Sequence, residues 1–408
     1  MKTLTGVTLA LLPLSALAAS TEYQDIERGR YISVLGDCAA CHTVDDDRPL
    51  AGGVPLETPF GTLIAPNITP DDATGLGRWS LEEFKAAMTE GVGKGGYHLY
   101  PAMPYPSYTL MTDKDIHDLW AFLQTVTPVE NDIEANQLPF PFSIRGVMRG
   151  WNWLNFDERR FEPDPEQPDD INRGAYLVES LGHCGTCHTP RNFMGGDGGD
   201  KFAGATIEGW YAPNITPNRH VGIGAWSEEE LVEYLKTGGN RFGFASGPMA
   251  DEVHHSSQYW SDSDLSAVAR YLLSGAGLES DDWDREPPEP LGEDDPQVRA
   301  GSHIYFDRCS GCHTPSGGGE EGIFPQLASN PLVNGDNTTS LIRVVLAGSR
   351  PVATDAKPTA PAMPAFAWNL SDEEVANVLT YVRNSWGNAA PAVAAGDVAD
   401  IREALEEE

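Results

Sequence analysis

The pattern Cys-x-x-Cys-His occurs three times in this chain of 408 residues. Two thiols with this spacing form thioether bonds to a haem, and the adjacent histidine becomes an axial ligand of its iron. The pattern therefore predicts three covalently bound c-type haems and a fold that surrounds each of them. The cysteines predicted to attach haem are Cys38, Cys41, Cys184, Cys187, Cys309 and Cys312, and the proximal iron ligands are His42, His188 and His313.

Zinc ribbons and redox dithiols also use paired cysteines. A zinc ribbon combines two pairs into four ligands, so three pairs would leave one pair without a partner and the histidines without a role. All six cysteines lie inside the three motifs, so no thiol remains for a disulfide. The number and spacing of the motifs favour haem over both alternatives.

The first two motifs lie in repeated surroundings. Pro66-Asn67-Ile68-Thr69-Pro70 recurs as Pro213 to Pro217, at nearly the offset that separates the motifs themselves. Each motif follows a short helical pattern, and each segment closes with a helical pattern of apolar residues such as Leu119, Leu272 and Leu379. Gly29, Gly174 and Gly301 are predicted to let these two helices approach closely. Ser227 with Glu230, and Ser371 with Glu374, have the spacing of a capping box.

Long loops rich in glycine and proline separate these helices, and they would suit a chain that wraps around a large flat cofactor. The sequence therefore predicts a mainly α protein of three tandem class-I-like cytochrome c domains with long haem-wrapping loops. The predicted divisions are a signal peptide (1–18), domain 1 (19–130), a linker or strap (131–170), domain 2 (171–278), an acidic linker (279–295), domain 3 (296–387) and an acidic tail (388–408).

The second axial ligand decides whether each iron can bind a substrate. Three methionines stand at matching places before the closing helices and next to proline, which stiffens the loop that presents the thioether. They are Met103, Met249 and Met363, found 61, 61 and 50 positions after the histidine of their motif. We predict that these methionines are the second axial ligands of the three irons, so that no position remains for a substrate. His254 and His255 follow Met249 and are competing candidates for the second site.

Composition restricts the location and the partners. The first 18 residues combine Lys2 with an apolar run and Ala16-Leu17-Ala18, which is typical of a secretory signal peptide. No later stretch is apolar enough to span a membrane. The net charge of −34 argues against nucleic acid as a partner and favours partners with basic patches. These features indicate a periplasmic protein.

Several loops resemble one family closely. Arg173-Gly174-Ala175-Tyr176-Leu177, Tyr211 to Pro217, Trp226 to Leu231 and Gly247-Pro248-Met249-Ala250 are similar to segments of the three-haem cytochrome c subunits of membrane-associated bacterial dehydrogenases for gluconate, alcohols and sorbitol. The resemblance implies a dehydrogenase large subunit of flavin or quinone type as partner, with a small third subunit in some complexes. It also implies ubiquinone or a terminal oxidase as acceptor, and peripheral association with the membrane.

The expected function is outer-sphere electron transfer from the partner dehydrogenase. By the resemblance, this chain contains no dehydrogenation site and no catalytic residue of its own. An independent multihaem electron carrier for another respiratory enzyme is the main alternative. A peroxidase-type haem enzyme is a further alternative that would require one open iron, such as the second haem without Met249.

Overall fold

The structure, a computed structural model, describes residues 14–278, 287–359 and 361–407, with side chains from residue 22 onward. Residues 1–13 of the predicted signal peptide (1–18) lie outside the described residues, and residues 14–18 form the start of α1 (Leu14–Leu35). Residues 279–286 of the predicted acidic linker also lie outside the described residues. The described chain is mainly helical, as predicted, and its sheets are three short antiparallel hairpins.

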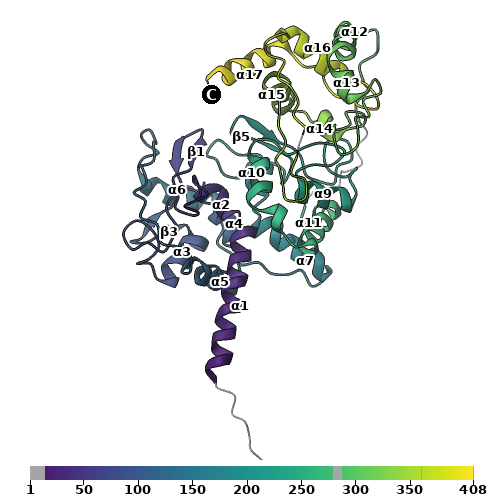
Figure 1. Ribbon diagram of the computed structural model, residues 1–408. Helices are drawn as coiled ribbons and strands as arrows, with labels where there is room; N and C mark the ends of the chain where they lie inside the picture. The colour runs from purple at the N-terminus through teal and green to yellow at the C-terminus, as the bar shows by residue number, and fades with distance from the viewer. Residues whose placement is uncertain (1–13, 279–286, 360, 408) are drawn as a thin grey trace, which may run out of the picture.

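The elements follow the three repeats along the chain, and Figure 1 shows them with the same labels. Around the first motif they are α1 (Leu14–Leu35), α2 (Cys38–His42), β1 (Pro55–Thr58), β2 (Gly61–Ile64), α3 (Leu81–Glu90), β3 (Val92–Gly93), β4 (Tyr97–His98), α4 (Tyr105–Tyr108) and α5 (Asp113–Leu123). The 3₁₀ turn η1 (Arg145–Val147) and α6 (Met148–Asn155) follow.

Similar sets of helices surround the second and third motifs. Around the second motif are α7 (Asp169–Tyr176), η2 (Leu177–Leu181), α8 (Gly185–His188), β5 (Ala205–Ile207), β6 (Trp210–Ala212), α9 (Glu228–Thr237), α10 (Pro248–His255), η3 (Ser257–Tyr259) and α11 (Asp262–Ser274). Around the third are α12 (Pro296–Ile304), η4 (Tyr305–Cys309), α13 (Ser310–His313), α14 (Pro331–Asn334), α15 (Thr339–Ala347), α16 (Asp372–Val382) and α17 (Ala395–Glu407). Both η2 and η4 are π-helical turns that lead into a haem motif.

A close helix crossing recurs in each repeat, and it depends on one glycine. A Cβ atom built on Gly29 of α1 would lie 1.8 Å from the carbonyl oxygen of Asp118 in α5. A Cβ atom built on Gly174 would lie 2.1 Å from the carbonyl oxygen of Ala267 in α11, and one built on Gly301 would lie 2.0 Å from that of Asn377 in α16. No larger residue fits at these distances. The predicted role of the three glycines is confirmed.

Helix starts also agree with the sequence. The capping boxes predicted for Ser227 with Glu230 and Ser371 with Glu374 are both present, and they begin α9 and α16. A third capping box, Ser80 with Glu83, begins α3. Each box satisfies backbone N–H groups that have no partner within the helix.

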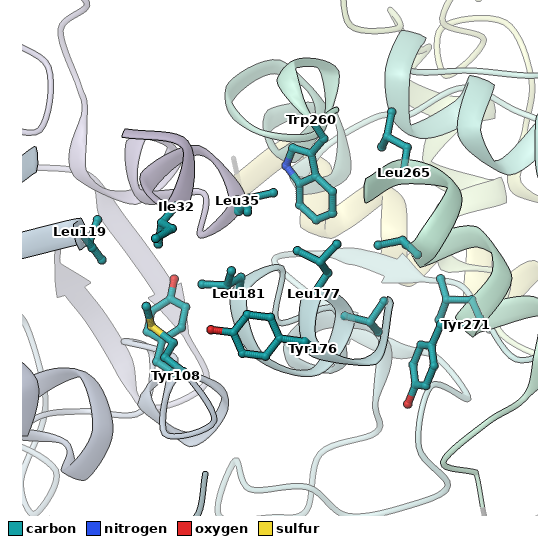
Figure 2. Packing of buried hydrophobic residues seen from close by; sticks show 14 of the residues in the cluster. Ile32, Leu35, Tyr108, Leu119, Tyr176, Leu177, Leu181, Trp260, Leu265 and Tyr271 are labelled. Carbon is teal, nitrogen blue, oxygen red and sulfur yellow. The ribbon is translucent and has the colours of Figure 1, made fainter. Parts of the chain in front are cut away.

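One continuous apolar core joins the first two repeats. Ile32 and Leu35 of α1 pack in the same cluster as Leu177 and Leu181 of η2, and Trp260 belongs to this cluster too (Figure 2). The third repeat has separate clusters. It lies against the second repeat in Figure 1, for example where the Ser246 and Ser349 hydroxyls are 2.6 Å apart.

The predicted linker or strap (131–170) connects the first two repeats, and its residues 138–156, to which we restrict the name strap from here on, pack on both. The Tyr100 hydroxyl donates to the Phe142 carbonyl oxygen at 2.8 Å on the side of the first repeat. On the side of the second repeat, Trp151 Nε1 donates to the Met194 carbonyl oxygen at 2.8 Å. These contacts hold α6 firmly in place.

The predicted acidic tail, residues 388–408, contains the helix α17, which lies against α15 and α16 (Figure 1). Val398 is fully buried, and Ile401 and Leu405 pack on the same cluster. The Arg402 guanidinium donates to Asp372 at 2.7 Å. These apolar residues of the tail therefore pack against the third repeat. Within the described residues, no helix has both the length and the apolar character that crossing a membrane requires.

Candidate haem-binding sites

The three motif histidines are held in the same way. Nδ1 of His42 lies 2.7 Å from the carbonyl oxygen of Pro66, and Nδ1 of His188 lies 2.7 Å from that of Pro213. For His313 the acceptor is the carbonyl oxygen of Pro325, at 3.0 Å. A backbone carbonyl can only accept, so Nδ1 carries the hydrogen and Nε2 keeps its lone pair. Each imidazole therefore presents Nε2 as a metal ligand.

Burial lowers the pKa of all three of these histidines. The neutral imidazole is the form that binds a metal, so the environment favours the ligating state. In the first two repeats, a backbone hydrogen bond from the loop that follows the motif adds to the support of the histidine. Gly52 N–H donates to the His42 carbonyl oxygen at 2.8 Å, and Gly204 N–H donates to that of His188 at 2.7 Å.

The motif cysteines form no disulfide with one another. Burial raises the pKa of Cys38 and of Cys309 to about 11. Redox dithiols of the Cys-x-x-Cys type need the opposite shift, because the thiolate is the reactive form. Among the described residues, no cysteine belongs to a cluster with the ligand count of a zinc site. The surroundings of the cysteines therefore support neither a redox dithiol nor a zinc ribbon.

The loop between the motif histidine and its proline differs among the sites. In the first two repeats this loop contains a hairpin, β1–β2 or β5–β6, whose strands pair antiparallel. The third repeat has no hairpin at this place, and Pro325 follows His313 after only 12 positions, against 24 and 25 in the others. The missing hairpin accounts for the shorter interval between His313 and Met363.

The repeated Pro-Asn-Ile-Thr-Pro loops support the proline carbonyls from behind. Oδ1 of Asn67 accepts from the backbone N–H of Thr69 at 2.9 Å and from its hydroxyl at 2.8 Å. Asn214 accepts from Thr216 in the same two ways, at 2.8 and 2.6 Å. These side-chain bonds hold a tight turn immediately after the proline. The turn therefore positions the acceptor of the histidine.

Met103 lies in the loop before α4 and packs against two apolar clusters, including one formed by Tyr105, Met148 and Trp151. The backbone of this loop is tied at Met103, whose N–H donates to the Tyr100 carbonyl oxygen at 3.1 Å. The strap covers the loop from outside, since the Tyr105 hydroxyl donates to Asn152 Oδ1 at 2.6 Å. The first methionine is thus held in a fixed loop.

A cavity of about 560 Å³ opens beside this loop. Its walls include Pro66, which holds His42, and Tyr100, which lies three positions before Met103. Asn131, Asn136 and Arg145 also line it. The cavity therefore adjoins the Pro66 loop that supports His42, but neither His42 nor Met103 lines it.

Met249 is the second residue of α10, directly after Pro248. The competing candidates, His254 and His255, lie in the last turn of the same helix, with ring centroids 4.6 Å apart. His254 is exposed, and burial together with the charge of His254 lowers the pKa of His255, which the carboxylates of Asp251 and Asp46 partly oppose. The helix that carries both histidines contacts α2 of the first repeat.

Met363 lies on a short antiparallel bridge in the third repeat. Its N–H donates to the Ser349 carbonyl oxygen at 2.8 Å, and Ser349 N–H donates back at 3.1 Å. Gly348 has a positive φ of 75° at the start of this bridge, a backbone conformation that glycine adopts without strain. The bridge fixes the backbone on which the third methionine is carried.

The proline carbonyls were not identified from the sequence as partners of the histidines. A backbone carbonyl has no residue-type signature, so only the recurrence of the Pro-Asn-Ile-Thr-Pro loop could have indicated this role. The cover that α6 provides over the Met103 loop was also missed. The aromatic residues of the strap indicated that it packs on the protein, but they did not indicate which loop it covers.

Comparison with known proteins shows the family to which the chain is similar. A family model described as Cytochrome c matches residues 26–127 and 298–386, which contain the first and third motifs. The chain is 39% identical to the gluconate 2-dehydrogenase cytochrome c subunit of Pantoea cypripedii, over 98% of this chain and 95% of that protein.

Two further relatives are similar over almost the same length. The cytochrome c subunit of alcohol dehydrogenase (quinone) from Gluconobacter oxydans is 39% identical, over 97% of this chain and 86% of that protein. The fructose dehydrogenase cytochrome subunit of Gluconobacter japonicus is 36% identical, over 98% and 87%. The chain belongs to the family of cytochrome c subunits of gluconate, alcohol and fructose dehydrogenases.

Proposed function

We propose that this chain is a periplasmic electron-transfer subunit that carries three haems c and accepts electrons from a flavin- or quinone-dependent dehydrogenase. The observation that supports this most strongly is the repeated support of the histidines, each tied through Nδ1 to a proline carbonyl. One such site could have several uses. Three of them, each beside a haem attachment motif and followed by a proline-held methionine, fit a relay.

The residues present fit haem at each motif. The paired thiols would attach it, and His42, His188 and His313 would supply the proximal nitrogen. Met103, Met249 and Met363 would supply the opposite sulfur. When bound, haem with these ligands supplies a one-electron Fe(III)/Fe(II) couple. The three-domain division and the wrapping of the long loops around the cofactors belong to the same proposal.

The chain's own part is to hold both ligands and to keep other molecules away from the iron. The proline carbonyls orient the imidazoles, and the hydrogen bond at Nδ1 increases the basicity of Nε2. Met103, Met249 and Met363 would occupy the position opposite each histidine, so that none would remain for a substrate. Electrons can then pass without bond formation. For this reason we assign the substrate oxidation to a separate subunit.

The partner in this proposal is a dehydrogenase large subunit for a sugar, sugar acid or alcohol, with a small third subunit in some complexes. Ubiquinone or a terminal oxidase would be the acceptor. The names of the relatives support the substrate class, since they are subunits of gluconate, alcohol and fructose dehydrogenases. The strongly acidic composition favours a partner with a basic docking surface.

Purification from the native source tests the partner. A tagged chain should retain a second protein that contains flavin or a quinone cofactor, identified by mass spectrometry and by its cofactor spectrum. If the chain purifies alone under mild conditions and haem reduction needs no such protein, it is an independent carrier. That result would contradict the subunit proposal while leaving the three haems in place.

Substitution of one methionine tests whether the methionines are the second axial ligands of the irons. Met103→Ala should let carbon monoxide bind to the first reduced haem alone, because the substitution removes the sulfur that fills its sixth position. Carbon monoxide difference spectra of the holo-protein provide the measurement. Met111→Leu is the control, since Met111 is fully buried in the core and lacks the proline setting. Carbon monoxide binding by the unsubstituted protein, or none by Met103→Ala, would refute the ligand assignment.

A further inference from the structure

The proline after the third motif lacks the Asn-Ile-Thr-Pro turn that follows Pro66 and Pro213. Pro325 is followed by Gln326-Leu327-Ala328, so no asparagine and threonine are present to form that turn. The Pro325 carbonyl oxygen nevertheless lies 3.0 Å from His313 Nδ1. Other contacts therefore hold this proline in place.

Part of the support comes from within the third repeat, and part comes from the second. Within the third repeat, the N–H of Leu327 donates to the Gly317 carbonyl oxygen at 2.7 Å. From the second repeat, the Arg241 carbonyl oxygen accepts from the N–H of Gln326 at 2.8 Å. The Arg241 guanidinium also donates to Gln326 Oε1 at 3.2 Å. The residue directly after Pro325 is thus bonded to the second repeat twice.

Asn330 adds a buried link between the same two loops. Its Nδ2 donates to the carbonyl oxygens of Phe242 and Gln326, each at 2.7 Å. Asn330 is 2% exposed, so the loss of these acceptors would leave a buried donor unsatisfied. One amide group therefore ties the loop after Pro325 to the second repeat.

The accepting loop, residues 240–243 of the second repeat, is itself firmly held. Asn240 Oδ1 accepts from the Phe242 N–H at 2.8 Å, and the Asn240 N–H donates to the Gly243 carbonyl oxygen at 3.0 Å. The Phe242 ring lies in the core that the first two repeats share, and it stacks on Trp226 with ring centroids 5.3 Å apart. The Phe242 carbonyl oxygen is therefore fixed relative to that core.

The third methionine is anchored to the second repeat as well. Met363 is paired with Ser349 through two backbone hydrogen bonds, and the Ser349 hydroxyl lies 2.6 Å from the Ser246 hydroxyl. Ser246 belongs to the second repeat and precedes Met249 by three positions. The segments that support both predicted ligands of the third iron are therefore bonded to the second repeat.

We propose that the second repeat positions both axial ligands of the third iron, through Arg241 and Phe242 on the histidine side and through Ser246 on the methionine side. The third repeat supplies the ligands, and the second supplies the surface that holds their loops. Contacts of this kind orient a ligand and tune the metal that it binds. They act on the ligands and not on the redox interaction between haems. The inference rests on the haem ligation in the proposed function.

Carbon monoxide binding by the reduced holo-protein tests the methionine side. Met363→Ala should open the third haem and so identifies its carbon monoxide spectrum. Ser246→Ala and Ser349→Ala should each raise the carbon monoxide affinity of the third haem about tenfold, because Met363 is held less firmly. The two changes together should act like either one alone, since both remove the same contact. Adding Ser246→Ala to Met363→Ala should open no second haem.

Ser340→Ala is the matched control. The Ser340 hydroxyl accepts from the Tyr211 N–H at 2.8 Å and so also joins the second and third repeats. Ser340 lies in the first turn of α15 and in neither ligand loop. Its substitution should leave carbon monoxide binding unchanged. An equal effect of Ser340→Ala and Ser349→Ala would show that any weakening of the interface suffices, which would overturn the proposal.

The reduction potential tests the histidine side. Gln326→Ala changes no charge and should raise the potential of the third haem, because a displaced Pro325 carbonyl accepts a weaker hydrogen bond and His313 then donates less charge to the iron. In the Arg241→Ala background the same change should have little further effect, since the side-chain contact is already lost. Redox titration followed by haem absorbance provides the measurement. An equal effect of Gln326→Ala with and without the Arg241 side chain would contradict the proposal.

The variants also separate this inference from the ligation on which it rests. If the Ser246 and Arg241 variants leave the third haem unchanged while Met363→Ala still opens it, the second repeat does not position these ligands and the ligation stands. If Met363→Ala opens no haem, the proposed ligation is wrong and this inference fails with it.

Discussion

Gly174 is the tightest point in the crossing of α7 and α11. We expect Gly174→Ala to destabilise the holo-protein by about 1–3 kcal/mol, because the added methyl group would overlap the Ala267 carbonyl and force the helices apart. Denaturant unfolding followed by circular dichroism gives the free energy. Gly150→Ala is the control, since its site is open, and alanine in a helix should raise the stability by about 0.5–1 kcal/mol. Equal effects at both sites would show that the crossing does not need glycine.

Asp264 joins the first two repeats through hydrogen bonds. It accepts from the Tyr31 hydroxyl at 2.7 Å and from Arg173 Nε at 2.8 Å. Burial raises the pKa of this carboxyl, but the hydrogen bond and charge of Arg173 outweigh burial and leave the pKa below its usual value. A depressed pKa means that the contribution to stability is present above the unfolded pKa of about 3.9 and is lost as the pH falls through the folded pKa.

Asp264→Asn should therefore lower the free energy of unfolding at pH 7 by about 1–3 kcal/mol, the range for hydrogen bonds to charged groups. The difference from the unsubstituted protein should shrink as the pH falls from about 4, where the carboxyl of the unfolded chain becomes protonated, through the lower pKa of the native carboxyl. Unfolding measured across this pH range provides the check. Asp262→Asn, at an exposed position on the same turn, should cost less than about 1 kcal/mol. A deficit that stays constant with pH would contradict the assignment.

At this scale the sequence indicated the residues to which we assign the chemistry. The motif cysteines, the histidines and the three crossing glycines could be predicted because each has a requirement that few residue types meet. Pro66, Pro213 and Pro325 act through their carbonyl oxygens, which every residue possesses. Their role depends on where the loop places each carbonyl oxygen. That position is set by contacts between residues that lie far apart in the sequence.

Among the elements, the helices were easier to predict than the segments between them. The closing helices show apolar residues at helical spacing, and α5, α11 and α16 bury them as expected. The sequence indicated only an acidic tail where α17 forms, although Val398, Ile401 and Leu405 have helical spacing. The many acidic residues around them obscured that pattern. The path of the strap depends on Tyr100, Tyr105 and Met194, so it could not be derived from the strap alone.

The loops between the helices should depend on the cofactor. Protein produced without haem attachment should show a weak helical signal and no cooperative unfolding transition, because the residues that face the cofactor would face water instead. Circular dichroism and thermal unfolding of the haem-free chain provide the measurement. A sharp transition near that of the holo-protein would mean that the apolar clusters alone specify the fold.

For the whole molecule, the arrangement favours close cooperation between the first two sites. Their repeats share one core, and α10, which carries Met249, contacts α2, which carries the first motif. The third repeat has its own clusters and packs on the second. Electrons are therefore expected to move readily between the first two haems. The third site is expected to be more independent in its potential.

The central claim is that three closed haems receive electrons from a partner dehydrogenase. It is tested most directly by mixing the copurified complex with the substrate that the partner oxidises, and following haem absorbance in a stopped-flow instrument. We predict that all three haems become reduced after the flavin or quinone cofactor, in proportion to substrate consumed. Reduction of the partner's cofactor while the haems of this chain remain oxidised would contradict the account.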